Sequence, residues 1–285
     1  MPDQPELPPE IEEIIFSLAV QDDWTSAKSL ILVAKRVHHW LIPQIYKVAI
    51  FHESRPERPT PKFDSRSLIT HGKHVRHAMF HNGTTRLTLL HNRPGECLAW
   101  CPNAIDVALW ISDECYDKVL IEQLLRLPLM RLSLNLGCLQ NTVRQYPEIS
   151  APIHFPSVTQ LELINPGNLI SPHQLKEMFP ALTHLALNAS GHNLISMTKD
   201  VLTLWKDQLK VLLWYRGESA SEYPTLAYPE DDNPLPSDDP RLVVIRYGRG
   251  YVGSWYEGTR GGLSIWRVAE EAITRPEEVS RDSSN

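Results

Sequence analysis

The densest group of potential metal ligands lies between residues 71 and 101. Its members are His71, His74, His77, His81, His91, Cys97 and Cys101. Imidazole and thiolate groups of this kind gather around Zn²⁺ in proteins. The spacing lacks the Cys-x₂-Cys pattern of zinc fingers, and we expect His77 and His81 to lie in a strand, along which side chains spread out rather than converge. We therefore favour polar loop and surface positions, with no metal or other cofactor, and keep a metal-dependent enzyme as the less favoured alternative.

Motifs of the common enzyme classes are missing from the sequence. It has no glycine-rich phosphate loop, no Gly-x-Ser-x-Gly elbow and no His-Glu-x-x-His. Its Asp and Glu residues are scattered, without a pair that the sequence places as acid and base. We expect no catalytic residues and a protein that is not an enzyme. The net charge of -6 also argues against a general nucleic-acid binder, which needs clustered Lys and Arg.

Residues 7–46 combine several short amphipathic segments. The first follows Leu7-Pro8-Pro9-Glu10 and carries apolar residues at intervals of three and four, namely Ile11, Ile14, Ile15 and Leu18. This spacing predicts a helix with one apolar stripe. A second helix is expected over Leu30 to Trp40 and a third from about Leu41 to Lys47. Three short helices cannot bury all of this apolar surface among themselves, so part of it is available to a partner or to the rest of the chain.

The same residues resemble an F-box, and their sequence is similar to that of the divergent F-box-like proteins of basidiomycete fungi. The resemblance implies a three-helix module that docks onto the Skp-type adaptor of a cullin-based (SCF) ubiquitin ligase. The positions that would contact the adaptor are Leu7, Pro8, Ile11, Ile15, Leu32, Val33, Lys35, Arg36, Val37 and Trp40. The C-terminal pattern of Trp255, Gly261-Gly262 and Trp266-x-x-Ala-Glu resembles the same family.

The remainder of the chain repeats one short pattern, apolar-x-x-apolar-x-apolar. The seven copies are Val75-Ala78-Phe80, Ala104-Val107-Leu109, Leu129-Leu132-Leu134, Val158-Leu161-Leu163, Leu182-Leu185-Leu187, Leu209-Leu212-Trp214 and Leu242-Ile245-Tyr247. They begin about 24 to 33 residues apart, close to the period of leucine-rich repeats. The expected fold class is α/β, with a solenoid of irregular leucine-rich-like strand–helix repeats. An ordinary α/β sheet with helices between its strands is the alternative.

Residues between the apolar strand positions are expected on a concave face that binds a target protein. A mixed face with exposed aromatic side chains suits a protein or peptide partner. The predicted target-binding residues are His77, Met79, Asp106, Trp110, Arg131, Asn135, Gln160, Glu162, His184, Leu213 and Tyr215.

The domain organisation follows from these segments. We expect a helical module over residues 1–50, a linker over 51–70 and repeats over 71–250 that include an acidic, proline-rich insertion at 217–240. A cap that covers the open end of the repeat stack follows at 251–275, and a disordered tail at 276–285. The four cysteines indicate reduced thiols and an intracellular protein, cytoplasmic or nuclear, that spans no membrane.

Two functions compete on this evidence. The first is a substrate-recognition subunit of an SCF-type E3 ubiquitin ligase, whose partners are a Skp-type adaptor, the cullin complex and an unknown target. The second is a non-catalytic interaction scaffold whose F-box-like helices only cap the repeats. The scaffold predicts that Leu7, Ile15 and Trp40 are buried against residues 47–52 and the first repeat.

Overall fold

The computed structural model describes residues 7–22, 26–52, 65–81, 93–111, 113–148, 153–164, 170–188, 193–218, 225–226, 238–247 and 251–274. Within these ranges no helix is both long enough and apolar enough to cross a bilayer. The predicted tail at 276–285 and most of the predicted insertion lie outside them.

A nine-stranded sheet in the order β1-β2-β3-β4-β5-β6-β7-β9-β8 forms the centre of the described chain. Neighbouring strands are parallel from β1 to β9, and β8 is antiparallel to β9. The strands are β1 (Val48–His52), β2 (His77–His81), β3 (Asp106–Trp110), β4 (Arg131–Asn135), β5 (Gln160–Ile164), β6 (His184–Asn188), β7 (Val211–Glu218), β8 (Thr225–Leu226) and β9 (Leu242–Tyr247). Each of the seven repeated motifs coincides with a strand, which confirms the predicted strand positions and the α/β class.

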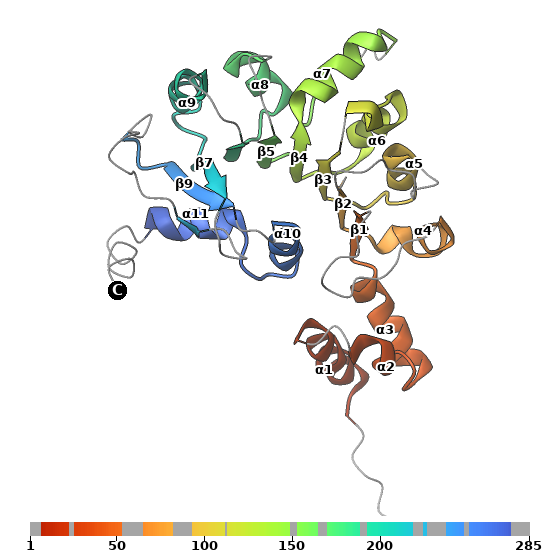
Figure 1. Cartoon of the computed structure of the whole chain (residues 1–285). Helices are drawn as coiled ribbons and strands as arrows, with labels where there is room; N and C mark the ends of the chain where they lie inside the picture. Colours follow the sequence, from red (N-terminus) through yellow and green to blue (C-terminus); the bar gives the residue numbers. More distant parts are fainter. Residues whose placement is uncertain are drawn as a thin grey trace, which may run out of the picture.

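Helices between the strands line the outer side of the curved sheet (Figure 1). They are α4 (Ser65–His71), α5 (Pro94–Ala99), α6 (Lys118–Arg126), α7 (Leu136–Gln145), α8 (Pro172–Met178) and α9 (Asn193–Leu204). Side-chain caps fix where several of them begin. Ser171 Oγ accepts a hydrogen bond from the Gln174 amide at 3.2 Å, with Pro172 at the first helical position.

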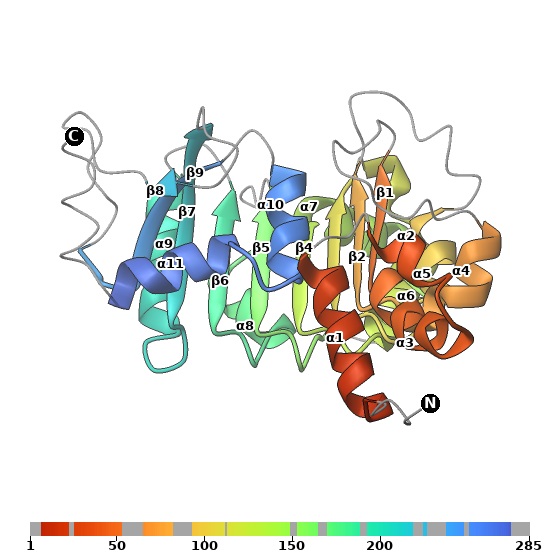
Figure 2. The ribbon, with the colours of Figure 1, turned by 90° about the horizontal axis from the view of Figure 1, so that it is seen from below.

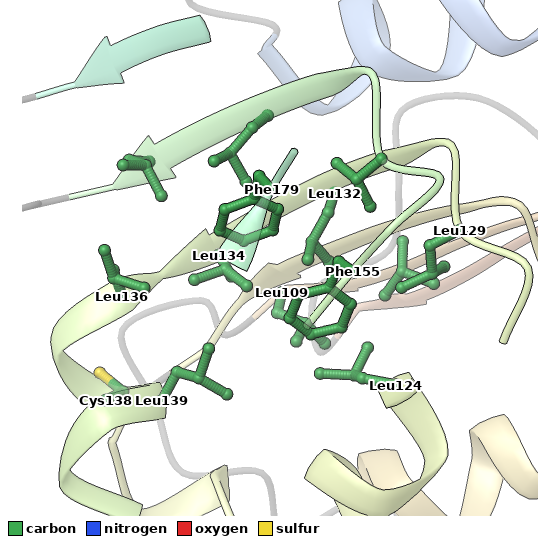
Figure 3. Packing of buried hydrophobic residues seen from close by; sticks show 14 of the residues in the cluster. Leu109, Leu124, Leu129, Leu132, Leu134, Leu136, Cys138, Leu139, Phe155 and Phe179 are labelled. Atoms are coloured by element: carbon green, nitrogen blue, oxygen red, sulfur yellow. The ribbon is translucent and has the colours of Figure 1, made fainter. Parts of the chain in front are cut away.

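The main hydrophobic core lies between the sheet and these outer helices. Alternate strand residues point into it, and Figure 3 shows Leu132 and Leu134 of β4 beside Leu124 and the rings of Phe155 and Phe179. The two rings are stacked with centroids 5.3 Å apart. Full burial of one such side chain stabilises the fold by about 2 kcal/mol, so this layer is the principal source of stability.

The N-terminal module consists of α1 (Pro9–Asp22), α2 (Ala27–Leu30) and α3 (Lys35–Ile45). The predicted second helix over Leu30 to Trp40 is wrong, because a turn separates α2 from α3 and Ala34 is extended. Of the residues predicted for a third helix, 41–45 belong to α3, and Tyr46 and Lys47 follow its end. A small hydrophobic core holds the module together and consists of Val20, Ala27, Val37, Leu41 and Ile45.

The predicted boundary at residue 50 divides β1, which pairs with β2 along its whole length. Residues 48–52 therefore belong to the sheet, and the predicted linker contains α4. The module joins the sheet directly at this point. Just before β1, the Tyr46 ring stacks on His71 of α4 with centroids 4.1 Å apart.

Two C-terminal helices, α10 (Tyr251–Thr259) and α11 (Ile265–Thr274), cross the inner face of the sheet (Figure 2). We predicted that this segment covers the open end of the repeat stack. Instead α11 packs on β7 and β9 through Trp266, Ala269 and Ile273. The physical reason is that Val211, Leu213, Val243 and Ile245 give the last strands a second apolar face, which requires a cover.

Candidate functional site

The parallel register aligns polar residues in rows across the inner face of the sheet. One row runs His77, Asp106, Arg131, Gln160 and His184 on successive strands. The next contains Ser133 and Glu162, which are directly paired. The sequence-based assignment of these residues to the face opposite the main core is therefore correct in register.

Part of this face is covered by α10 and α11, which limits what a partner can reach. Met79 packs with Ala108 and Tyr256 under α10, and Leu213 packs under α11. Both side chains are 0% exposed, so their predicted direct contact with a target protein is wrong. Their apolar character serves the packing of the C-terminal helices instead.

A pocket of about 640 Å³, counting its open mouth, remains between the sheet and the two helices. The sheet contributes Asp106, Trp110, Arg131, Leu132, Ser133, Gln160, Glu162 and Tyr215. The helices and the loop between them contribute Ser254, Trp255, Gly258, Thr259, Ser264, Ile265 and Trp266. The fold thus brings together six of the predicted target-binding residues in one cavity.

A chain of hydrogen bonds runs along the floor of this pocket. Trp110 Nε1 donates to Ser133 Oγ at 2.6 Å, and Ser133 Oγ donates to Glu162 Oε2 at 2.7 Å. The Tyr215 hydroxyl donates to Glu162 Oε1 at 3.1 Å. Three strands thereby hold one buried carboxylate in a fixed position, with both of its oxygens accepting.

A second carboxylate, Asp106, lies beside the first row. Its Oδ2 is 3.1 Å from His77 Nδ1 and 4.0 Å from Arg131 Nη1. The Trp255 ring stands edge-on to the His77 imidazole, with centroids 6.5 Å apart. Residues on β2, β3, β4 and α10 are thus linked at this side of the pocket.

The remaining predicted target-binding residues make hydrogen bonds within the protein instead of lining the pocket. The Asn135 side chain accepts hydrogen bonds from the amides of Gly137 and Cys138 and so caps α7. His184 is buried, and its Nε2 lies 2.9 Å from Glu270 Oε1 of α11 while its Nδ1 lies 2.7 Å from Thr183 Oγ1. Burial lowers the pKa of His184, and Glu270 opposes this shift without reversing it.

Acidification should therefore destabilise the protein through His184. The unfolded chain takes up a proton near pH 6.5, whereas the folded chain does so only at lower pH, so stability is present above pH 6.5 and is lost as the pH falls through the folded pKa. We expect His184→Gln to reduce the loss of unfolding free energy between about pH 7.5 and about pH 5.5. Urea unfolding at the two pH values measures this loss of unfolding free energy. His71 and His74, whose pKa values burial also lowers, should account for dependence that persists.

A matched control for this effect is His173→Gln on α8, where the histidine is exposed. It should leave the pH dependence as it is in the unaltered protein. An unchanged pH dependence in His184→Gln would contradict the argument.

The predicted adaptor-binding residues fall into two groups. Eight are exposed at the surface of the N-terminal module, namely Leu7, Pro8, Ile11, Ile15, Leu32, Val33, Lys35 and Arg36. Val37 is only 2% exposed and belongs to the core of the module, so its predicted contact with an adaptor is wrong. Trp40 is half-buried against the same core.

The potential metal ligands are dispersed. Cys97 and Cys101 are buried in the main core, where burial raises each thiol pKa to about 12. The His81 ring stands edge-on to Trp110. In the part of the chain that the structure describes, which leaves out His91, no three His, Cys, Asp or Glu side chains are placed to hold a metal ion.

Sequence reasoning missed the helix-borne side of the pocket. Trp255 and Trp266 stood out only as a resemblance at the C-terminus, and Ser254, Thr259 and Ser264 carried no signal. Periodicity cannot place them, because their neighbours on the sheet lie roughly 40 to 160 residues away along the chain. The register of Ser133 beside Glu162 did follow from the repeated motif.

Comparison with protein-family models, curated proteins and solved structures found no match to this chain. Function is therefore inferred from the geometry of the module and the sheet.

Proposed function

We propose that this protein is a substrate-recognition subunit of an SCF-type ubiquitin ligase, in which α1 to α3 form an F-box-like module that docks a Skp-type adaptor. The observation that carries the proposal is the exposed apolar side of the module. Among the described residues, seven of the ten exposed large hydrophobic side chains lie in the first 33 residues. They are Leu7, Ile11, Ile14, Ile15, Leu18, Leu32 and Val33.

These side chains form a surface rather than scattered positions. The four from α1 that follow Leu7 lie at helical spacings of three and four, so they share one side of that helix. Phe16 and Val20 take the other side and pack into the module. An ion pair of 2.9 Å between Glu12 and Arg36 ties α1 to the first turn of α3, next to the turn with Leu32 and Val33. Exposed apolar side chains concentrated in one small module are typical of a protein interaction site.

The same exposure favours the receptor over the scaffold. A module that served only as a cap would bury Leu7 and Ile15 against β1, but both side chains are about half exposed. The module contacts α4 through Tyr46, whose ring stacks on His71, at the end of the module that is farthest in sequence from Leu7. The apolar side of α1 therefore remains exposed and available to a partner.

The parallel sheet supports the second half of the proposal, an irregular leucine-rich-like repeat array that presents a target. From β1 to β7 each strand pairs with the next along the chain, and one helix or turn connects them, which is the organisation of stacked repeats. A bound target would be held close to the ubiquitin-carrying enzyme. Tethering of this kind raises the effective concentration of the reacting groups and needs no catalytic residue in the receptor.

The direct test is co-expression of the full chain with a Skp-type adaptor. We expect the two to co-purify as a complex that survives size-exclusion chromatography. Recovery of the chain alone, correctly folded by circular dichroism, would overturn the adaptor role.

A further inference from the structure

The pocket beneath α10 and α11 has the composition of a site for an organic cation. Four aromatic side chains line it, and each comes from a different element, namely Trp110 (β3), Tyr215 (β7), Trp255 (α10) and Trp266, which belongs to α11. Its ionisable lining consists of the carboxylates of Asp106 and Glu162 and the guanidinium of Arg131. With all three ionised, the lining carries one net negative charge. Aromatic faces and an excess of carboxylate both attract positive charge.

The direction of the hydrogen bonds requires Glu162 to accept. An indole N–H can only donate, so Trp110 fixes Ser133 Oγ as an acceptor at that contact and leaves its proton for Glu162. The Tyr215 hydroxyl reaches the other carboxylate oxygen. Both oxygens of Glu162 therefore accept hydrogen bonds, which fixes this carboxyl group in the pocket wall.

The aromatic rings are held in place by neighbouring histidines. Imidazoles stand edge-on to the indoles in the pairs His81–Trp110, His77–Trp255 and His184–Trp266, with interplanar angles of 88°, 80° and 79°. Because each tryptophan is restrained by a residue of the sheet, little side-chain freedom is lost when a ligand enters. Such preorganisation strengthens binding.

Unused hydrogen-bonding atoms sit in the same wall. Ser254 is 4% exposed, and its Oγ has no hydrogen-bond partner among the described residues. The same holds for the buried Oε1 of Gln160. An amide oxygen can only accept, so it suits a ligand that brings an N–H donor.

We propose that this pocket binds a protonated amine with apolar substituents, its ammonium directed at Glu162 and its substituents between the tryptophan rings. The proposal stands independently of the adaptor role, because no residue of the N-terminal module lines the pocket. A free amine and the lysine side chain of a peptide share this chemistry. The experiment below separates the two sources.

The test measures binding of matched probes to the full chain by isothermal titration calorimetry. For the free amine, 2-phenylethylammonium is compared with its neutral counterpart 2-phenylethanol. For the side chain, a short blocked peptide with a central lysine is compared with the same peptide carrying norleucine. We expect the charged member of at least one pair to bind about tenfold more tightly than the neutral member, and the pair with the larger difference identifies the source.

Variants then locate the binding to the pocket. Glu162→Gln keeps the shape of the side chain and removes its charge, so the preference for the charged probe should disappear. The control Glu122→Gln removes a half-exposed carboxylate on the outer helix α6 and should change nothing. Should Glu162→Gln fail to fold, Trp255→Leu provides the second variant, and it should weaken the charged probe more than the neutral one.

Three outcomes would overturn the proposal. The first is equal binding of charged and neutral probes, and the second is no binding of either ammonium probe at millimolar concentration. The third is tighter binding of the anion 3-phenylpropionate, which would assign the pocket to Arg131 rather than to Glu162.

Discussion

Replacing Ile11 or Val33 by glutamate should abolish co-purification with a Skp-type adaptor. The two side chains are 43% and 62% exposed, so the folded chain accepts a charge at either position with little loss of stability. In a complex the same carboxylate would be desolvated against an apolar partner without a counter-charge. A central interface residue contributes about 2 kcal/mol or more, so we expect affinity to fall by at least about 30-fold. Co-purification and calorimetric titration with the adaptor measure the loss.

Ile69→Glu is the matched control for this experiment. Ile69 lies on α4, outside the module, and is 67% exposed. The substitution introduces the same charge at an equally exposed apolar residue and should leave adaptor binding intact. Val37→Glu would be uninformative, because Val37 belongs to the module core and its replacement would unfold the module. Full recovery of the complex with Ile11→Glu and Val33→Glu would count decisively against adaptor docking.

The strands were predictable because their pattern is local. A motif such as Leu129-Leu132-Leu134 places apolar residues on one side of a strand, and the period of two then assigns Ser133 to the other side. The same reasoning gave the rows that carry Asp106 and Glu162. Register followed from β2 to β7, because each of these repeats buries the same positions against its neighbours. It did not follow for β9, where Leu242 rather than Ile245 pairs with Leu212 and Ile245 lies on the inner face.

The covering of the inner face was not predictable in this way. Val211, Leu213 and Tyr215 alternate with a second apolar set in β7, so the strand has two buried faces and its sequence does not say what covers each. The cover comes from α10 and α11. Leu213 is buried by packing between segments that are far apart in the sequence, and Val37 is buried by packing between the helices of the module.

The start of helix α5 is hard to recognise in the sequence for a different reason. Pro94-Gly95 is a strong turn signal in a sequence, yet Pro94 occupies the first turn of a helix, where its missing N–H costs nothing. Glycine would normally weaken a helix at the next position. At this position, however, the neighbouring helix α6 leaves no room for a side chain.

Gly95→Ala should lower the free energy of unfolding by about 3 kcal/mol, because α5 and α6 approach each other too closely at this glycine for a side chain. A Cβ at this position would lie 2.5 Å from the backbone nitrogen of Leu120 and 2.8 Å from the carbonyl carbon of Val119. Both atoms are backbone and cannot rotate away. The N-terminal turn of α6 would have to move.

That displacement would also break the cap of α6. The Leu120 amide donates to Asp117 Oδ1 at 2.8 Å, and Asp117 Oδ2 in turn lies 3.2 Å from Arg93 Nη1, just before α5. Loss of an N-cap costs about 1 kcal/mol on its own. The methyl group therefore strains the helix pair and removes the hydrogen bond that starts the second helix, and urea unfolding followed by circular dichroism measures the sum.

Gly253→Ala separates this steric effect from helix propensity. Gly253 lies within α10, and a Cβ added there meets no atom within 4 Å. Alanine is the better helix former by up to about 1 kcal/mol, so this control should raise stability while Gly95→Ala lowers it. Opposite signs for one chemical change in two helices would establish close approach as the reason for Gly95. Equal stabilisation of both variants would show instead that α5 and α6 are not packed at this distance.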